Sequence, residues 1–171
     1  MLRFIALALA STAAFGQGRP ATEAEIKAQD FTVLPNGAGL PKGSGDASRG
    51  RTIYEQKCTE CHGQKGEGQT GKYPAIAGGM GSLKSLKPVK TVGSYWPYAT
   101  TLFDYIRRAM PYDHPRSLST DDVYSVAAFV LYMNGIVTET QELNERSLPQ
   151  IKMPNRDGFI PDQRPDIKAK H

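Results

Sequence analysis

The sequence of 171 residues has only two cysteines, and it lacks strand-like alternation and internal repeats. Two cysteines with two residues between them make a poor structural disulfide, because the closed ring is tight and staples little chain. No segment beyond the first residues approaches the roughly 20 apolar residues of a membrane helix. We therefore expect no membrane span, and the absence of strand patterning favours an all-α fold.

The N-terminus has the pattern of an export signal. The letters MLRF precede an apolar run from Phe4 to Ala14, and the small residues Ala14 and Gly16 stand at the −3 and −1 positions before Gln17. No cysteine follows the run, which argues against a lipid-linked N-terminus. Residues 1–16 are therefore predicted to be a signal peptide, and we expect a periplasmic protein.

The formal charge is mildly positive, at +4, and Arg3 lies in the predicted signal peptide. This charge is too small to indicate a nucleic-acid partner. Five lysines nevertheless gather in one stretch. Either they are ordinary solvated side chains, or they form a face that steers an acidic redox partner: Lys65, Lys72, Lys84, Lys87 and Lys90.

Composition divides the rest of the chain into three parts. Residues 17–45 contain many small residues, Gly and Pro without periodicity and are predicted to be an extended arm. Residues 46–135 carry the helical patterns of one domain. Residues 136–171 are polar and rich in Pro, with one turn near Ser147 and Leu148, and we expect a tail that lies on the domain surface.

Three helices are expected within the domain. Asp46 is a suitable N-cap for the first, which leads to Cys58. The second starts at Thr100 or Thr101 and ends at Met110, because Pro111 cannot continue it. The third follows the N-cap Ser119 and ends at Asn134 and Gly135. Between the first two helices, residues 63–97 are predicted to be loops with a short turn near Leu83, as expected of a chain that wraps a large prosthetic group.

The run Cys58-Thr-Glu-Cys61-His62 indicates covalent haem attachment. Two thiols one helical turn apart can form thioether bonds to one haem, and the adjacent imidazole of His62 is then held at the iron. A redox dithiol would be expected at a strand end, but helix precedes Cys58. Zinc would need two more ligands at metal spacing. One haem c, bound through Cys58, Cys61 and His62, is therefore predicted.

The sixth iron ligand has several candidates. Met110 is our choice, because it ends a helix before Pro111 and can be offered from a loop. Met133 falls within a helical core stripe and is more typical of packing. The remaining candidates are Met80, Met153, His114 and His171.

His and Met ligation would keep the iron six-coordinate in both oxidation states and favour the ferrous form. No position then remains for a substrate, which predicts electron transfer and not catalysis. The carbonyl of Pro74 is a candidate acceptor for the other ring N–H of His62, although an ordinary turn proline explains this residue as well.

The order of these features resembles class I cytochrome c over residues 46–135: a capped helix with Gly50 and Tyr54, CTECH, YPAIAGG, a helix ending in AMP, and AAFVLYMNG. The resemblance implies an all-α class I cytochrome c fold with long loops around one haem. It implies that the first and last helices cross, with Gly50 and Tyr54 against Ala127, Val130 and Leu131. It also places the Met ligand at Met110.

Two longer strings, YWPYATTLFDYIRRAMPYDHPRSL and KMPNRDGFIPDQRPD, resemble the cytochrome subunits or domains of bacterial molybdenum sulfite or sulfane dehydrogenases. The resemblance implies a one-electron acceptor for such an enzyme, with onward transfer to a cytochrome or terminal oxidase. Some of these relatives carry two haems, whereas this sequence has one CxxCH. A general periplasmic carrier, the cytochrome subunit of another dehydrogenase, and a haem enzyme or gas sensor with a labile sixth ligand are the alternatives.

Overall fold

The computed structural model describes residues 18–160 and residue 162. The predicted signal peptide and His171 lie outside this part. The described chain falls into two units, one ending at Asp30 and the other beginning at Phe31. Within the described residues, no helix has both the length and the apolar character needed to cross a membrane.

The first unit contains helix α1, Glu23–Gln29, where the sequence predicted an extended arm. A capping box begins this helix, because Thr22 and Glu25 bond each other's backbone N–H groups. All of its residues are exposed. The prediction missed α1 because a helix of this length with no buried face has no apolar periodicity to detect.

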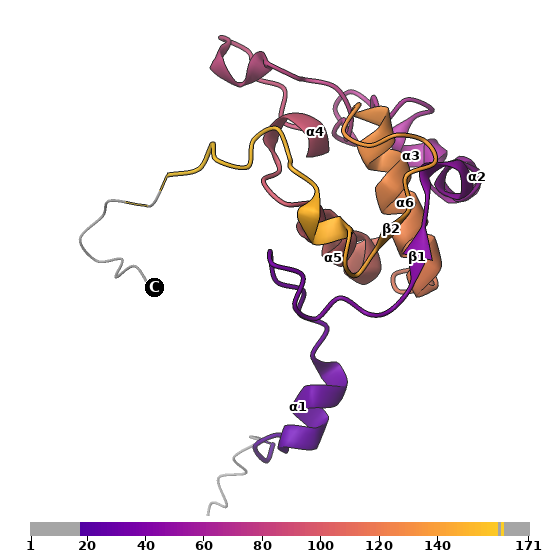
Figure 1. Ribbon diagram of the computed structural model, residues 1–171, viewed down its shortest axis with the longest axis vertical. Coiled ribbons are helices and arrows are strands. Elements are labelled where there is room, and N and C mark those ends of the chain that lie inside the picture. Colours follow the sequence, from indigo (N-terminus) through magenta and orange to yellow (C-terminus); the bar gives the residue numbers. More distant parts are fainter. Residues whose placement is uncertain (1–17, 161, 163–171) are drawn as a thin grey trace, which may run out of the picture. The chain divides into compact units, whose positions relative to one another are not determined.

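The second unit is mainly helical, which confirms the all-α class (Figure 1). Two sequence predictions need correction: α4 lies in the stretch read as loop, and two very short strands pair antiparallel. The elements are β1 (Ser44–Gly45), α2 (Ala47–Lys57), α3 (Thr59–His62), the 3-10 turn η1 (Ser82–Lys84), α4 (Val92–Tyr95), α5 (Ala99–Ala109), α6 (Thr120–Met133), β2 (Leu143–Asn144) and the 3-10 turn η2 (Leu148–Gln150).

The helix ends follow the predicted caps in two of three cases. Asp46 accepts the N–H of Arg49 at the start of α2, and Ser119 accepts the N–H of Asp122 at the start of α6. Helix α5 begins at Ala99, before the predicted threonines, and has no side-chain cap. Thr100 is buried and donates to the Pro35 carbonyl instead, so the threonine signal was misread.

Helices α2 and α6 cross closely, as expected, and α2 is seen nearly end-on beside α6 in Figure 1. A Cβ on Gly50 would lie 1.9 Å from the carbonyl oxygen of Ser125 and 2.9 Å from the Cβ of Phe129. Only glycine therefore fits at this position. The atoms nearest Gly50 thus belong to Ser125 and Phe129 and not to the residues predicted, because α6 presents a neighbouring face to α2.

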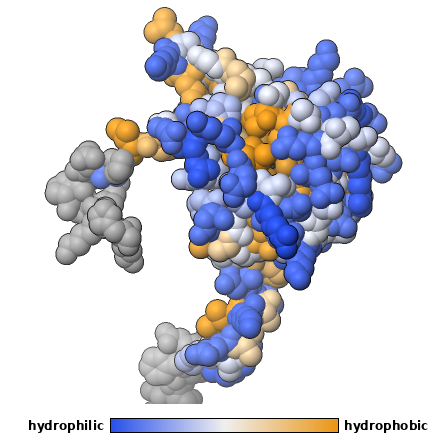
Figure 2. Space-filling model, viewed as in Figure 1, coloured by the Kyte–Doolittle hydropathy of each residue, from blue (hydrophilic) through white to orange (hydrophobic). Residues whose placement is uncertain are grey.

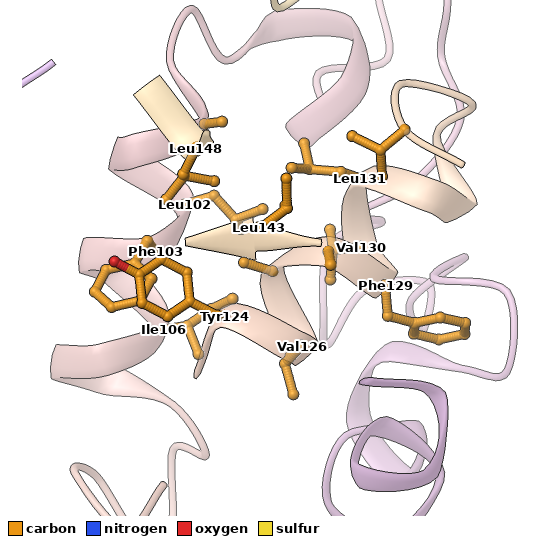
Figure 3. Close-up of a cluster of buried hydrophobic side chains, with 14 of the residues drawn as sticks. Leu102, Phe103, Ile106, Tyr124, Val126, Phe129, Val130, Leu131, Leu143 and Leu148 are labelled. Atoms are coloured by element: carbon orange, nitrogen blue, oxygen red, sulfur yellow. The ribbon is translucent and has the colours of Figure 1, made fainter. Parts of the chain in front are cut away.

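Helix α6 is buried along most of its length and forms the centre of the core. The rings of Phe103 in α5 and Tyr124 in α6 pack with centroids 4.4 Å apart. Figure 3 shows side chains from α5, α6 and the segment after α6 meeting in one cluster. The labelled members are Leu102, Phe103, Ile106, Tyr124, Val126, Phe129, Val130, Leu131, Leu143 and Leu148.

The segment after α6 is part of this core, whereas the sequence predicted a tail on the surface. Leu143, Leu148 and Met153 are almost fully buried. Farther along, the side-chain amide of Asn155 donates to the Tyr95 carbonyl at 2.7 Å. The prediction was based on the average composition of the segment, which is polar and rich in proline. A few widely spaced apolar side chains are nevertheless enough to anchor it in the core.

Candidate functional site

A cavity of about 620 Å³ lies among α2, α3, α4, α5, α6 and the loop around Pro74. Its size is within the range of about 300 to 1,000 Å³ that is usual for ligand sites. Figure 2 shows an apolar patch on an otherwise largely polar face of the molecule. Most of the cavity wall is apolar or aromatic, with contributions from Tyr54, Ile76, Val92, Trp96, Leu102, Ile106, Leu118, Val126 and Val130.

The CTECH motif lies at this cavity, at the junction of two helices. Cys58 ends α2 and precedes α3, a single turn in which the N–H of His62 donates to the Cys58 carbonyl at 2.9 Å. Gly63 ends the turn at φ +75°, which favours glycine. The hydroxyl of Tyr54 donates to the Gly63 carbonyl. This bend therefore places Cys58, Cys61 and His62 together on the cavity wall.

The environment of the Cys58 thiol argues against a dithiol redox centre. Both cysteines are free and partly buried. Burial raises the pKa of Cys58 to about 11, and this outweighs the opposing charge of Lys57. The thiolate is the reactive form of cysteine, so this environment suppresses it. Among the described residues, no group of three or more His, Cys, Asp and Glu side chains could hold a metal ion.

His62 has the properties expected of an imidazole ligand. Burial lowers its pKa, which favours the neutral ring that binds metals. Its Nδ1 is buried and has no hydrogen-bond partner in the structure. The hydrogen bond predicted between His62 and the Pro74 carbonyl is therefore not formed in this structure, although Pro74 does line the cavity. An apolar cavity, two adjacent thiols and a neutral imidazole together fit a haem.

Among the sixth-ligand candidates in the described chain, only Met110 lines the cavity. It follows the last residue of α5 in extended conformation, and its N–H still bonds the Ile106 carbonyl. Met80 is 51% exposed, whereas Met153 is 1% exposed within the core. His114 is an exposed side chain paired with Asp113. Met110 is thus the one described candidate positioned at the cavity. That it ligates the iron stays a prediction.

Sequence reasoning missed two features of the cavity. Trp96 lines the wall and meets the half-exposed Tyr105 edge to face, with ring centroids 5.8 Å apart. Asn134, predicted only to end α6, bonds the Gly78 N–H and the Ile76 carbonyl and so ties α6 to the loop beside the cavity. The aromatic residues of the WPY string could have indicated the aromatic wall. No local pattern indicates the contact of Asn134 with Gly78 and Ile76, because these residues are far apart in the sequence.

Comparisons by sequence and by structure both find sulfane or thiosulfate dehydrogenases that are similar to this chain. The structure of sulfane dehydrogenase SoxCD from Paracoccus pantotrophus matches with a TM-score of 0.79 and 46% identity, over 87% of this chain and 73% of that chain. A thiosulfate dehydrogenase of Psychrobacter arcticus is 30% identical over 60% of this chain and 32% of its own length. That of Thiomonas intermedia is 31% identical over 67% and 33%.

This chain spans about a third of the length of these curated relatives. The family model for cytochrome c matches residues 47–134, just over half of the chain. The match includes CTECH, all of α2, α5 and α6, and Met110. The chain therefore belongs to the cytochrome c family of electron-transfer proteins, whose cofactor is haem c.

Proposed function

We propose that this protein is a periplasmic cytochrome with one haem, which accepts single electrons and passes them onward. In this proposal residues 1–16 are the signal peptide, residues 17–45 an N-terminal arm, residues 46–135 the cytochrome domain, and residues 136–171 the tail. The observation that carries the proposal is the cavity wall, which unites the CTECH residues with Met110 and leaves the other described candidates outside.

Haem c, when bound, supplies an iron that gains and loses one electron. Cys58 and Cys61 would hold it covalently, and His62 and Met110 would ligate its iron. Tyr54 keeps the end of α3 in place through its bond to the Gly63 carbonyl. Apolar side chains of α5 and α6 line the site and would exclude water from around the bound group. These residues need not rearrange between oxidation states, which favours fast electron transfer over catalysis.

A spectroscopic experiment tests the ligand set. We expect the holoprotein to show a thioether-type haem spectrum and a Met-to-iron charge-transfer band that disappears in Met110→Ala and persists in the matched control Met80→Ala. Cys58→Ser with Cys61→Ser should abolish covalent haem on a denaturing gel. A band that survives in Met110→Ala would remove this residue from the site.

Carbon monoxide distinguishes an electron carrier from a haem enzyme or gas sensor. A firmly held Met110 should make binding of carbon monoxide by the reduced wild-type protein slow, and Met110→Ala should make it fast. Rapid binding by the wild-type protein would instead favour a labile sixth ligand and contradict the carrier function.

The proposed donor is a molybdenum sulfite or sulfane dehydrogenase, and the proposed acceptor is a downstream cytochrome or oxidase. The 46% identity to a sulfane dehydrogenase structure and the similarity to thiosulfate dehydrogenases support a role in sulfur oxidation. Mixing the purified protein with such a dehydrogenase and its sulfur substrate should reduce the haem at catalytic rates. Failure would leave a general carrier, or a subunit of another dehydrogenase, as the function.

A further inference from the structure

One loop of the second unit carries an apolar side chain that no other described residue covers. Residues 79–90, here termed the Leu86 loop, include η1 and project from the body ahead of α4 (Figure 1). Leu86 is fully exposed, and Met80 and Val89 are about half exposed. Figure 2 shows hydrophobic residues on this projection. Exposed apolar side chains that gather on one segment can mark an interaction site, whereas singly scattered ones are normal.

The loop is held in one shape at its base. The hydroxyl of Ser82 donates to the Gly79 carbonyl at 2.6 Å and accepts the Val89 N–H at 3.0 Å. The hydroxyl of Ser94 donates to the Val89 carbonyl at 2.6 Å. Gly79 has φ +70°, and a Cβ there would lie 2.3 Å from the Val89 carbonyl oxygen. A partner that binds this loop would therefore lose little conformational entropy in ordering it.

The charge of the surrounding sequence has one sign. From residue 68 to residue 103 the chain contains four lysines and neither aspartate nor glutamate. Lys84 and Lys87 flank Leu86 and are exposed. The ion pairs of the described residues include no lysine of this loop. An apolar tip with a positive rim is complementary to an apolar recess with an acidic rim.

The loop also leads directly to the cavity. Lys90 lies at its end and Thr91 follows, and both line the cavity wall. The ammonium group of Lys90 lies over the Tyr95 ring, 4.9 Å from its centroid. A protein bound to the loop would therefore lie next to the haem pocket. One exposed leucine gives little apolar area for a lipid surface, where stable anchoring needs a second strong signal.

We infer that the Leu86 loop is a docking site for the electron-donating dehydrogenase, with Leu86 entering an apolar recess and Lys84 and Lys87 facing acidic side chains around it. This inference rests on the proposed function. Burial of one leucine side chain corresponds to roughly a tenfold to hundredfold change in affinity. The two lysines act mainly on the rate of encounter, and their effect weakens with salt.

The test measures reduction of the holoprotein by the purified molybdenum sulfite or sulfane dehydrogenase with its sulfur substrate. Leu86→Ala should raise KM for the cytochrome about tenfold at every salt concentration and leave kcat unchanged. Lys84→Gln with Lys87→Gln should raise KM at low salt only. Leu34→Ala, at another exposed leucine, and Lys42→Gln, at a lysine outside the loop, are the matched controls.

The outcomes separate the two proposals. Normal reduction of the wild-type protein with unchanged KM in Leu86→Ala overturns the docking loop alone. No reduction of the wild-type protein, with ascorbate still reducing its haem, overturns the proposed donor and the docking loop with it. Binding of the wild-type protein to vesicles of anionic phospholipid, lost in Leu86→Ala, would assign the loop to a membrane and overturn the inference as well.

Discussion

The α2–α6 crossing and the loop of residues 63–90 are built in opposite ways. This loop, here termed the loop wall, contributes Tyr73, Pro74, Ala75, Ile76 and Lys90 to the lining of the cavity. At the crossing, atoms of α2 and α6 are in direct contact. At Gly50 the two helices lie so close that there is no room for a side chain. Along the loop wall the only buried residue is Gly66. The wall is held instead by hydrogen bonds, such as the one that the Gly78 N–H donates to Asn134 and the one that Asn134 donates to the Ile76 carbonyl.

This difference indicates which region is stabilised by contacts within the protein and which would be stabilised by the bound cofactor. The crossing buries its apolar side chains against other parts of the chain, so its stability is internal. The apolar side chains of the loop wall, such as Ile76, line the cavity. A bound haem would supply the packing contacts that these side chains do not make with other protein atoms. We expect the loop wall to open first when haem is absent.

The largest effect is expected from breaking the crossing with Gly50→Leu. The added side chain would overlap the Ser125 carbonyl, so the helices must separate. We expect a loss of more than about 3 kcal/mol of stability, at or above the upper end for overpacking. Urea unfolding followed by circular dichroism measures it. Glu55→Leu, on an exposed position of α2, is the matched control, and equal losses in both variants would contradict the role of the crossing.

A smaller loss is expected when the tail's anchor is truncated by Leu148→Ala. Leu148 is fully buried, and its removal leaves a cavity in the core that the tail completes. The expected cost is about 3 kcal/mol of unfolding free energy. Thermal unfolding checks it against Gln150→Ala, an exposed neighbour. Equal midpoints in the two variants would show that the tail contributes nothing to the core.

The loop wall can be loosened separately by Asn134→Ala. The substitution leaves the Gly78 N–H and the Ile76 carbonyl without this partner. We expect about 2 kcal/mol of destabilisation, with faster hydrogen exchange at Gly78 and unchanged exchange within α2. Asn36→Ala, where the lost bond is exposed and local, is the control. If α2 and the wall open to the same extent, the two regions are one cooperative unit.

The smallest effect concerns the Arg49–Asp122 ion pair, 2.7 Å long, between α2 and α6. Burial raises the pKa of Asp122, but hydrogen bonds from Ser119 and Arg49 outweigh it and hold the pKa below its usual value. The carboxylate therefore stabilises the fold above the unfolded pKa of about 4 and ceases to do so as pH falls through the lower folded value.

Asp122→Asn should therefore cost about 0.5 kcal/mol at pH 7 and less at pH 2. Urea unfolding at both values measures the difference, with the exposed Asp157→Asn as the control. The same loss at both pH values would show that the substitution acts through packing and not through charge.

The sequence alone was sufficient for several local signals. The spacing of CTECH, the caps Asp46 and Ser119, and the stop at Pro111 each depend on neighbours within a few residues, and the structure contains the helix ends they predict. It was insufficient for α1, which has no buried face, and for α5, where Thr100 bonds Pro35 and does not cap.

By itself, then, the sequence determined the attachment motif, the helical class and the family resemblance, because covalent spacing and helix signals are properties of adjacent residues. Only the tertiary structure decided that Met110 and not Met80 or Met153 reaches the cavity, that Gly50 meets Ser125, and that the tail enters the core. These outcomes depend on which helix faces meet and on distances between segments far apart in the chain, which no local pattern records.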